Sequence, residues 1–355
     1  MRPADSSPNL VFISHHTTPE PTQYPRNGNT MLELSTSYDA LRQTAGVYCR
    51  GTATVRIHGT DRVALATRLL AKSIEFAPID SCVDSLLLDE HGAPLGLALA
   101  LLRDDAIVLI TEADDAWFAL AQREASAFDV TIEQVAEVCV AVEGPLSWQV
   151  VEPIVTDRGI ADVLLGEVLE AELAGESVLV ARTGTTAEFG YVVVGSESIV
   201  APLIAAAAAA GGGEIDPAVL DRVRVETNYP VLPQQLADAT VLEAGLGWFA
   251  TLGREDEFVS AAIAELAAPE RRAIAAEFDG DSPAAGTEVR DGERVIGRVL
   301  VATERAGRDT GLALLLVDDP FGVPGLELDV DGAPARTLAR PTIAPASWDA
   351  QIGVR

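Results

Sequence analysis

The spacing of apolar residues changes at Ala268-Pro269, and this change constrains the fold more than any other feature of the sequence. Before it, stretches with the 3.6-residue period of helices alternate with stretches that have the two-residue period of strands. After it, from about residue 272 to 345, short alternating strands are separated by Gly and Asp turns. Strands of this length and spacing favour a small β-barrel. The sequence therefore predicts an α+β core followed by a C-terminal β-barrel.

The same patterns divide the 355 residues into four segments. Residues 1–30 are rich in Pro, Ser and Thr and lack a continuous apolar run, so they are predicted to be a disordered tail and not a signal peptide. Residues 31–268 are predicted to form the core, 269–345 the barrel, and 346–355 a second tail. No apolar stretch predicts a membrane-spanning helix of about 20 residues, so no membrane partner is expected.

Two local signals define helix ends in the second half of the core. Three glycines follow the predicted helix at 198–210, and they indicate a helix C-cap because no Gly-Lys-Ser/Thr phosphate-binding pattern is present. The next helix is predicted to begin with Asp216 as its N-cap and Pro217 as its first residue.

The chain is strongly acidic, with 54 acidic against 25 basic residues and a net charge of -29. Lys72 is the only lysine. This balance argues against binding to nucleic acid or to an anionic membrane, since both require clusters of basic residues. Because the acidic residues are spread along the whole chain, we favour adaptation to concentrated salt over a patch for one cationic partner. Either interpretation indicates a cytoplasmic protein.

Few residues offer metal-based or nucleophilic chemistry. Cys49, Cys82 and Cys139 lie far apart in apolar runs and are predicted to be buried free thiols. The chain has four histidines and none of the H-E-x-x-H, G-x-S-x-G, G-x-G-x-x-G or C-x-x-C patterns. A histidine-based hydrolase or a zinc enzyme is therefore not predicted, and no metal site is expected.

Four strings carry more information through their order: AGVYCRGTATVRIHGTD (45–61), CVAVEGPLSWQVV (139–151), ARTGTTAEFGYVVV (181–194) and LDRVRVETNYPVLPQQL (220–236). Together they resemble the glycine-cleavage T-protein family of folate-binding aminomethyltransferases. That family shows A-G-V-F-D, I-x-x-Q-G-P, R-T-G-Y-T-G-E-x-G-F/Y and R-D-x-L-R-L-E-A patterns in the same order. A later stretch with Gly247-Trp248 and Glu257-Phe258 is also similar. The resemblance spans about residues 35 to 340.

The resemblance implies a folate-binding T-protein-like core and the transfer of a one-carbon unit to tetrahydrofolate. The donor would be an aminomethyl-carrying lipoyl protein or a small molecule. The folate-binding positions that it implies are Glu226, Glu188, Arg224, Tyr191 and Trp248. A carboxylate at 226 can accept paired hydrogen bonds from the N–H and amino edge of a pterin ring.

The residues taken alone leave other roles open. Glu226 could be a solvated helix acid or pair with Arg222 four residues earlier, and Glu188 could be an exposed turn acid. Arg224 is expected to pair with an interior carboxylate. The two aromatic residues could belong to the core or to a cavity wall.

Departures from the family pattern leave the catalytic residue unassigned. The family carries its catalytic carboxylate in a G-x-x-x-D-D-type segment, where this chain has Leu95 and Gly96. In the next strand, Thr111-Glu112 replaces an Asn-Ala pair. We therefore consider both an aminomethyltransferase and a non-catalytic folate-binding or regulatory protein, with a retained fold that binds no folate as a third alternative. The iron–sulfur assembly branch, marked by K-G-C-Y-x-G-Q-E, is not supported by REDEFVSAAI.

Overall fold

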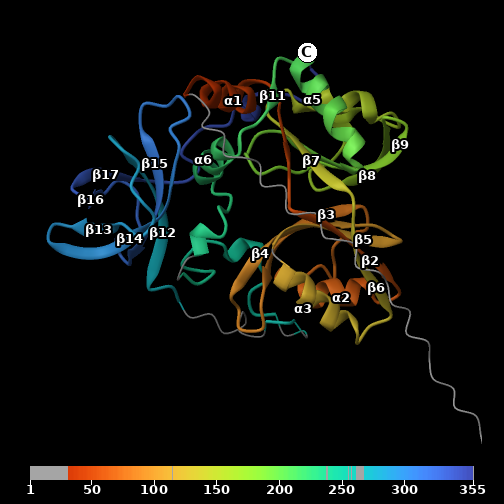
Figure 1. The fold of residues 1–355 in the computed structure, drawn as a ribbon, viewed down its shortest axis with the longest axis horizontal. Coiled ribbons are helices and arrows are strands. Elements are labelled where there is room, and N and C mark those ends of the chain that lie inside the picture. Colours follow the sequence, from red (N-terminus) through yellow and green to blue (C-terminus); the bar gives the residue numbers. More distant parts are fainter. Residues whose placement is uncertain are drawn as a thin grey trace, which may run out of the picture.

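In the computed structural model, two β-sheets are stacked face to face, helices cover their outer faces, and a β-barrel lies beside them (Figure 1). The structure describes residues 31–113, 115–236, 239–254, 256, 258–260 and 268–354. The predicted tail at 1–30 and Glu257 of the last motif lie outside the described residues.

The first sheet has the strand order β11-β1-β7-β10-β9-β8 and is antiparallel except for the parallel pair β1–β11. Its outer face is covered by α4 and α5, whose apolar side chains pack on it. The elements are β1 (Gly46–Cys49), β7 (Val138–Glu143), β8 (Val168–Leu173), β9 (Glu176–Ala181), β10 (Gly190–Gly195), β11 (Gly213–Glu214), α4 (Ser147–Val151) and α5 (Val200–Ala209).

The second sheet is antiparallel throughout, with the order β3-β4-β5-β2-β6. Helices α2 and α3 cover its outer face. The elements are β2 (Ala53–Gly59), β3 (Ser81–Leu88), β4 (Pro94–Leu102), β5 (Ala106–Ala113), β6 (Val130–Val135), α2 (Arg62–Leu69) and α3 (Asp115–Ala125).

The main core lies between the two sheets and follows from the two-residue period of their strands. On β7, Cys139 and Ala141 face this inner core, while Val140 and Val142 face α4 and α5. Because successive side chains point to opposite faces of a strand, each sheet buries apolar residues on both sides. Cys139 is buried and Cys82 half-buried, but Cys49 is exposed at the end of β1, so the prediction of burial is wrong for Cys49.

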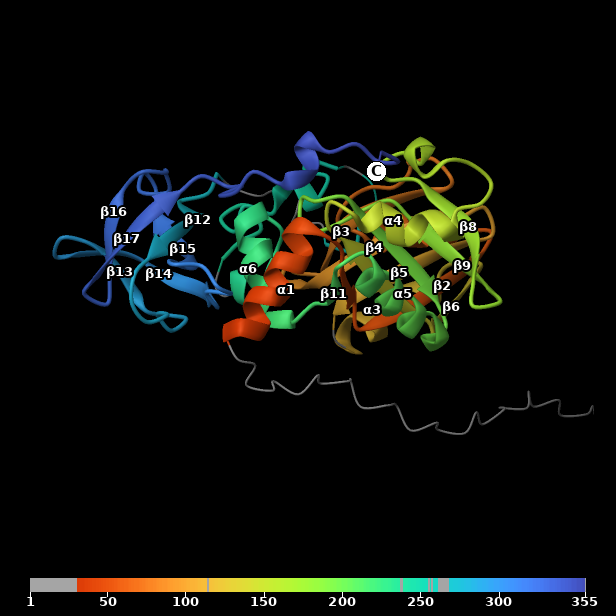
Figure 2. The same cartoon turned by 90° about the horizontal axis from the view of Figure 1, so that it is seen from above.

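Helices α1 (Met31–Gln43) and α6 (Pro217–Thr227) lie between the sheets and the barrel (Figure 2). The start of α6 confirms the predicted cap: the Asp216 side chain accepts a hydrogen bond from the Ala218 N–H, and Pro217 is the first helical residue. The helix ends at Thr227 and is capped by Asn228, which adopts a left-handed conformation with φ of 67°.

The C-terminal strands form the predicted barrel, which is closed in the order β12-β15-β14-β13-β16-β17. It is packed against α6 through β14 and β15. The strands are β12 (Arg271–Phe278), β13 (Glu288–Asp291), β14 (Arg294–Thr303), β15 (Gly311–Asp318), β16 (Glu327–Val330) and β17 (Ala333–Leu338).

Short 3₁₀-helices occupy several connections. They are η1 (Glu152–Ile154), η2 (Ile160–Asp162), η3 (Glu197–Ile199), η4 (Gln234–Leu236), η5 (Gly247–Phe249) and η7 (Ala346–Asp349). The last of these lies in the segment that was predicted to be a tail. Across the described part of the chain, no helix is long and apolar enough to cross a membrane.

Candidate functional site

A cluster of charged side chains gathers where the second sheet meets α6. Asp84 on β3 is paired with Leu99 of β4, and Glu112 on β5 is paired with Leu97 of the same strand. Because Leu97 and Leu99 are two residues apart, both carboxylates project from the inner face of the sheet. No local pattern marks this pair, since the strand register alone brings it together.

Two arginines and a tyrosine complete this cluster. Nη2 of Arg50, which follows β1, donates to Asp84 Oδ1 and, over 2.7 Å, to the Tyr229 hydroxyl. The Tyr229 hydroxyl lies 3.2 Å from Asp84 Oδ1 and donates to it. Arg224 on α6 donates from both Nη atoms to the two oxygens of Glu112, over 3.3 and 3.4 Å. The prediction that Arg224 pairs with an interior carboxylate is therefore confirmed.

The Tyr229 ring lies at the centre of the cluster. The guanidinium carbons of Arg50 and Arg224 lie 5.9 and 5.6 Å from the ring centroid, within cation–π range. Burial raises the pKa of Tyr229 well above its ordinary value, although Arg50 opposes this shift. Burial alone would lower the pKa of Arg50, but Tyr229 and Asp84 raise it well above the usual value. Tyr229 thus stays a hydrogen-bond donor and Arg50 a cation.

Several polar atoms of the cluster are available to bind a ligand. Arg50 is only 4% exposed, yet its Nη1 has no hydrogen-bond partner among the described residues, and the same holds for the buried Nε of Arg224. The side chains of Asp84 and Glu112 are 21% and 22% exposed. Buried N–H groups without a partner are costly, so these atoms favour a ligand that offers hydrogen-bond acceptors.

An aromatic surface connects the cluster to solvent. Trp248 is 47% exposed, and its ring centroid lies 6.4 Å from that of Tyr229 in an edge-on arrangement. The Trp248 ring also packs on the buried Phe249, with centroids 3.7 Å apart. The Lys72 ammonium donates to the Trp248 carbonyl over 3.1 Å. The exposed face of Trp248 can therefore support a flat ligand beside the charged cluster.

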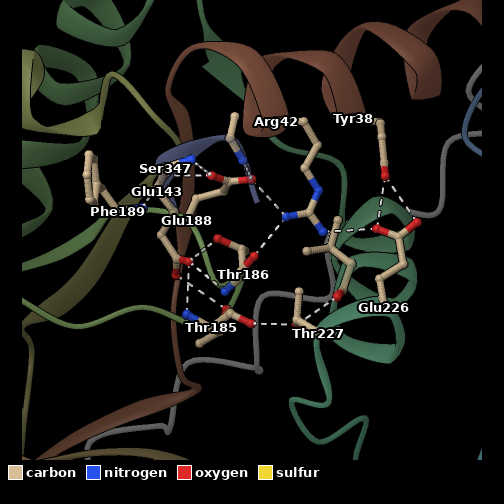
Figure 3. Close-up of polar contacts among 12 residues, drawn as sticks. Tyr38, Arg42, Glu143, Thr185, Thr186, Glu188, Phe189, Glu226, Thr227 and Ser347 are labelled. Atoms are coloured by element: carbon tan, nitrogen blue, oxygen red, sulfur yellow. Dashed lines mark hydrogen bonds and ion pairs between the residues drawn. The ribbon is translucent and has the colours of Figure 1, made fainter. Parts of the chain in front are cut away.

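Glu226 belongs to a second, closed cluster and is only 1% exposed. Its oxygens accept hydrogen bonds from the Tyr38 hydroxyl at 2.9 and 3.1 Å and from Arg42 Nη2 at 2.9 Å (Figure 3). They also accept one from Arg222 Nε at 2.9 Å. The alternative pairing with Arg222 is therefore confirmed. Glu226 anchors α1 to α6, and its contact with a pterin ring stays a prediction.

Glu188 is tied to the same arginine from the other side. It accepts from Arg42 Nη1 over 3.2 Å and from the backbone N–H and hydroxyl of Ser347 over 2.9 and 2.6 Å (Figure 3). It is 7% exposed, so the alternative that it is an exposed turn acid is wrong. Arg42 was missed in the sequence because one arginine on an expected helix looks like a surface residue.

A third buried acid, Glu143, explains the glycines of the 181–194 motif. It accepts hydrogen bonds from the backbone N–H groups of Thr185 and Thr186, each over 2.9 Å (Figure 3). It also accepts one from the Tyr48 hydroxyl. A Cβ atom on Gly184 would lie 3.0 Å from Glu143 Oε2. One on Gly190 would lie 2.6 Å from the Thr183 carbonyl oxygen and 3.2 Å from Glu143 Cγ. Gly184 therefore leaves room for this carboxylate, and Gly190 leaves room for the Thr183 backbone as well.

Two expected positions lie away from the charged cluster. Tyr191 is fully buried opposite Val142 and packs on the outer face of the first sheet, so the alternation of the strand turns it away from the cluster. Leu95 likewise packs toward α2 and α3 on the outer face of the second sheet. A Cβ on Gly96 would lie 2.1 Å from the Glu112 carbonyl oxygen, so a side chain does not fit there.

Comparisons with known proteins agree with this architecture. The model of the GCVT N-terminal domain family matches residues 8–254. An aminomethyltransferase of Cutibacterium acnes is 27% identical over 314 residues, covering 83% of this chain and 85% of that protein. One from Lysinibacillus sphaericus is 25% identical over 316 residues, covering 84% and 85%. The crystal structure of glycine cleavage system aminomethyltransferase T from Bartonella henselae superimposes with a TM-score of 0.77 at 18% identity, covering 88% of this chain and 90% of that one.

Proposed function

This chain belongs to the glycine-cleavage T-protein (GCVT) family, and from this membership we propose that it binds tetrahydrofolate and transfers a one-carbon unit to it. Its curated relatives bear the name aminomethyltransferase and align with most of its length. The reaction would take the carbon from an aminomethyl group on a lipoyl-bearing carrier protein or on a small-molecule donor.

The observation that carries this proposal is the chemistry of the charged cluster. Arg50 Nη1 and Arg224 Nε are buried donors without partners, and two partly exposed carboxylates lie beside them. A pterin ring is flat and carries both carbonyl and ring-nitrogen acceptors and N–H donors, so it complements both sets. The half-exposed Trp248 offers the ring a surface on which to pack.

These contacts favour three different roles for the five expected folate-binding residues. We propose that Arg224 and Trp248 contact the folate, together with Arg50, which the motifs did not point to. For Glu226 and Glu188 the ion pairs with Arg42 favour an indirect role, in which they hold α1 beside the site. Tyr191 packs on the outer face of the first sheet, away from the charged cluster.

One feature of the sequence favours the non-catalytic alternative. Neither Leu95 nor Gly96 carries an ionisable group, and the family places its catalytic acid there. The enzyme is favoured because Asp84 and Glu112 supply carboxylates from the two neighbouring strands. A measurement of catalytic turnover distinguishes these two functions, because a regulatory protein would bind folate without catalysing one-carbon transfer.

The acidic composition supports two further proposals about the setting. We propose that the protein works in the cytoplasm at high salt, where the salt screens the mutual repulsion of the carboxylates that give the net charge of -29. The same charge disfavours nucleic acid as a partner.

The first experiment is a calorimetric titration of the wild-type protein with tetrahydrofolate in molar potassium chloride. An assay of one-carbon transfer from an aminomethylated lipoyl carrier follows. We expect saturable binding that Arg224→Gln weakens by about ten- to a hundredfold, since a charge-assisted hydrogen bond contributes about 1.5–3 kcal/mol. Arg272→Gln, which removes an exposed arginine paired with Asp319 on the barrel, should not change the affinity. Wild-type protein that binds no folate at millimolar concentration would refute the proposal.

A further inference from the structure

We propose that Asp84 is the catalytic carboxylate of this chain and replaces the acid that is missing at Leu95 and Gly96. This inference rests on the proposed function. It assigns to a residue of β3 a task that the family pattern places on β4. Asp84 lies next to β4 in the sheet, and its side chain reaches the inner face, where Arg50, Arg224 and Tyr229 meet.

The contacts of Asp84 leave one oxygen for chemistry. Among the described residues, both of its hydrogen-bond partners, Arg50 and Tyr229, lie on Oδ1. With a side chain that is 21% exposed, Oδ2 is open to a ligand. Two donors on one oxygen fix the orientation of the carboxylate, which is what a group that moves a proton requires. Arg50 and Tyr229 thus act as positioning residues.

The other acids around the site are less suited to this task. Both oxygens of Glu112 accept from Arg224, so this carboxylate neutralises an arginine. Glu143 and Glu226 are 0% and 1% exposed, and their oxygens are taken by internal donors. Of these four carboxylates, Asp84 alone combines partial exposure with an open oxygen.

The reaction requires one proton to move. In the transfer of the aminomethyl group, the nitrogen of bound tetrahydrofolate forms the new N–C bond and the C–S bond to the carrier breaks. The proton of that nitrogen ends on the departing sulfur, and the amino group stays on the transferred carbon in this step. We assign this proton to Asp84 Oδ2, which accepts it from the nitrogen and releases it to the sulfur. Atoms and electrons balance without an oxidant or reductant, and the carboxylate returns to its starting state.

The competing explanation is that Asp84 serves only as the counter-ion of Arg50. Three variants separate the two roles: Asp84→Asn, Glu112→Gln and, as a matched control, Asp318→Asn. Asp318 is also a strand aspartate paired with an arginine, but it lies on the barrel. For each protein, the thermal midpoint, tetrahydrofolate affinity and pH–rate profile are measured.

If Asp84 moves the proton, Asp84→Asn lowers kcat at least about 100-fold, while the folate dissociation constant changes only a few-fold. Its pH–rate profile loses the acidic limb, and Asp84→Glu restores part of the rate. Glu112→Gln weakens folate binding but keeps the acidic limb, and Asp318→Asn changes none of these quantities.

Distinct outcomes would overturn the inference. An Asp84→Asn protein with wild-type kcat would refute it and leave the proposed function intact. Parallel losses of stability, affinity and rate that Asp84→Glu does not restore would make Asp84 a counter-ion. If Asp84→Asn does not fold, Tyr229→Phe keeps the ring and removes the hydroxyl, and an unshifted acidic limb in that variant would refute the inference. Wild-type protein that binds no folate would overturn the proposed function as well.

Discussion

The hydroxyl of Tyr229 lies 3.2 Å from Oδ1 of Asp84, and this hydrogen bond joins the segment after α6 to the inner face of the second sheet. The same tyrosine ring contacts Phe249 and Trp248 edge-on, with centroids 5.5 and 6.4 Å away. A ligand resting on Trp248 would therefore lie beside the tyrosine that orients Asp84. This relationship connects the proposed folate surface to the proposed proton acceptor.

Trp248→Ala should weaken tetrahydrofolate binding by about two- to tenfold, since an aromatic contact contributes about 0.5–1.5 kcal/mol beyond its area. Calorimetry gives the affinity, and quenching of tryptophan fluorescence by the ligand should largely disappear in the variant. Trp348→Ala is the control, because Trp348 is 66% exposed and lies in the C-terminal segment. Equal effects of the two substitutions would place the folate elsewhere.

Glu226→Gln should lower the free energy of unfolding by about 3 kcal/mol, because it leaves the buried Arg42 and Arg222 without their shared carboxylate. Urea denaturation without ligand measures this loss. Glu288→Gln, which removes one partner of an exposed ion pair on the barrel, should change the stability little. If Glu226 instead contacts the pterin ring and does not anchor the arginines, folate affinity will fall ten- to a hundredfold at unchanged stability.

The ion pair between Glu243 and Arg271 should make the attachment of the barrel sensitive to acid. Arg271 donates to both oxygens of Glu243 over 2.8 and 2.9 Å, and these hydrogen bonds lower the pKa of the carboxyl below its ordinary value. Because the pKa is lower in the folded than in the unfolded state, the pair stabilises the protein above the unfolded pKa of about 4.3. This contribution is lost as the pH falls through the folded value.

The thermal midpoint of Glu243→Gln should therefore lie below that of the wild type at pH 7, and the difference should narrow below about pH 4. Thermal unfolding followed by circular dichroism between pH 3 and 8 measures it. A difference that stays constant over this range would show that the variant acts through packing and not through the charge.

Of the three cysteines, only Cys49 should react with iodoacetamide in the folded protein at pH 8. Burial raises the pKa of the Cys82 and Cys139 thiols to about 12, so almost none of either is thiolate at that pH. Cys49 is exposed at the end of β1. Mass spectrometry should find one modified residue, none in Cys49→Ser, and three after denaturation in urea. Rapid native labelling of Cys139 would contradict this expectation.

The thermal midpoint of the wild type should rise as potassium chloride increases from low to molar concentration. The net charge of -29 makes the carboxylates repel one another, and the Debye length falls to about 3 Å at 1 M salt. Differential scanning calorimetry across the salt series measures the effect. A flat or falling midpoint would count against salt adaptation and favour the single cationic partner.

Local patterns in the sequence were sufficient to predict the C-terminal barrel, the N-cap of α6 and the protein family. The change of periodicity after Pro269 predicts short strands because alternation and turn residues act over a few positions, and the barrel strands begin at Arg271. The Asp216 cap is equally local, since its side chain reaches a backbone N–H two residues away. The order of the four motifs indicated the family without any information about tertiary contacts.

Only the tertiary structure decided the partners of the charged residues. Glu226 and Glu188 share Arg42, which comes from a helix more than 140 residues earlier in the chain. Asp84 and Glu112 lie on one face because both strands pair with β4 in a particular register. With 54 acidic residues in the chain, composition cannot single out this pair. Ion pairs between distant segments depend on strand register and packing, and no local pattern of residues encodes those.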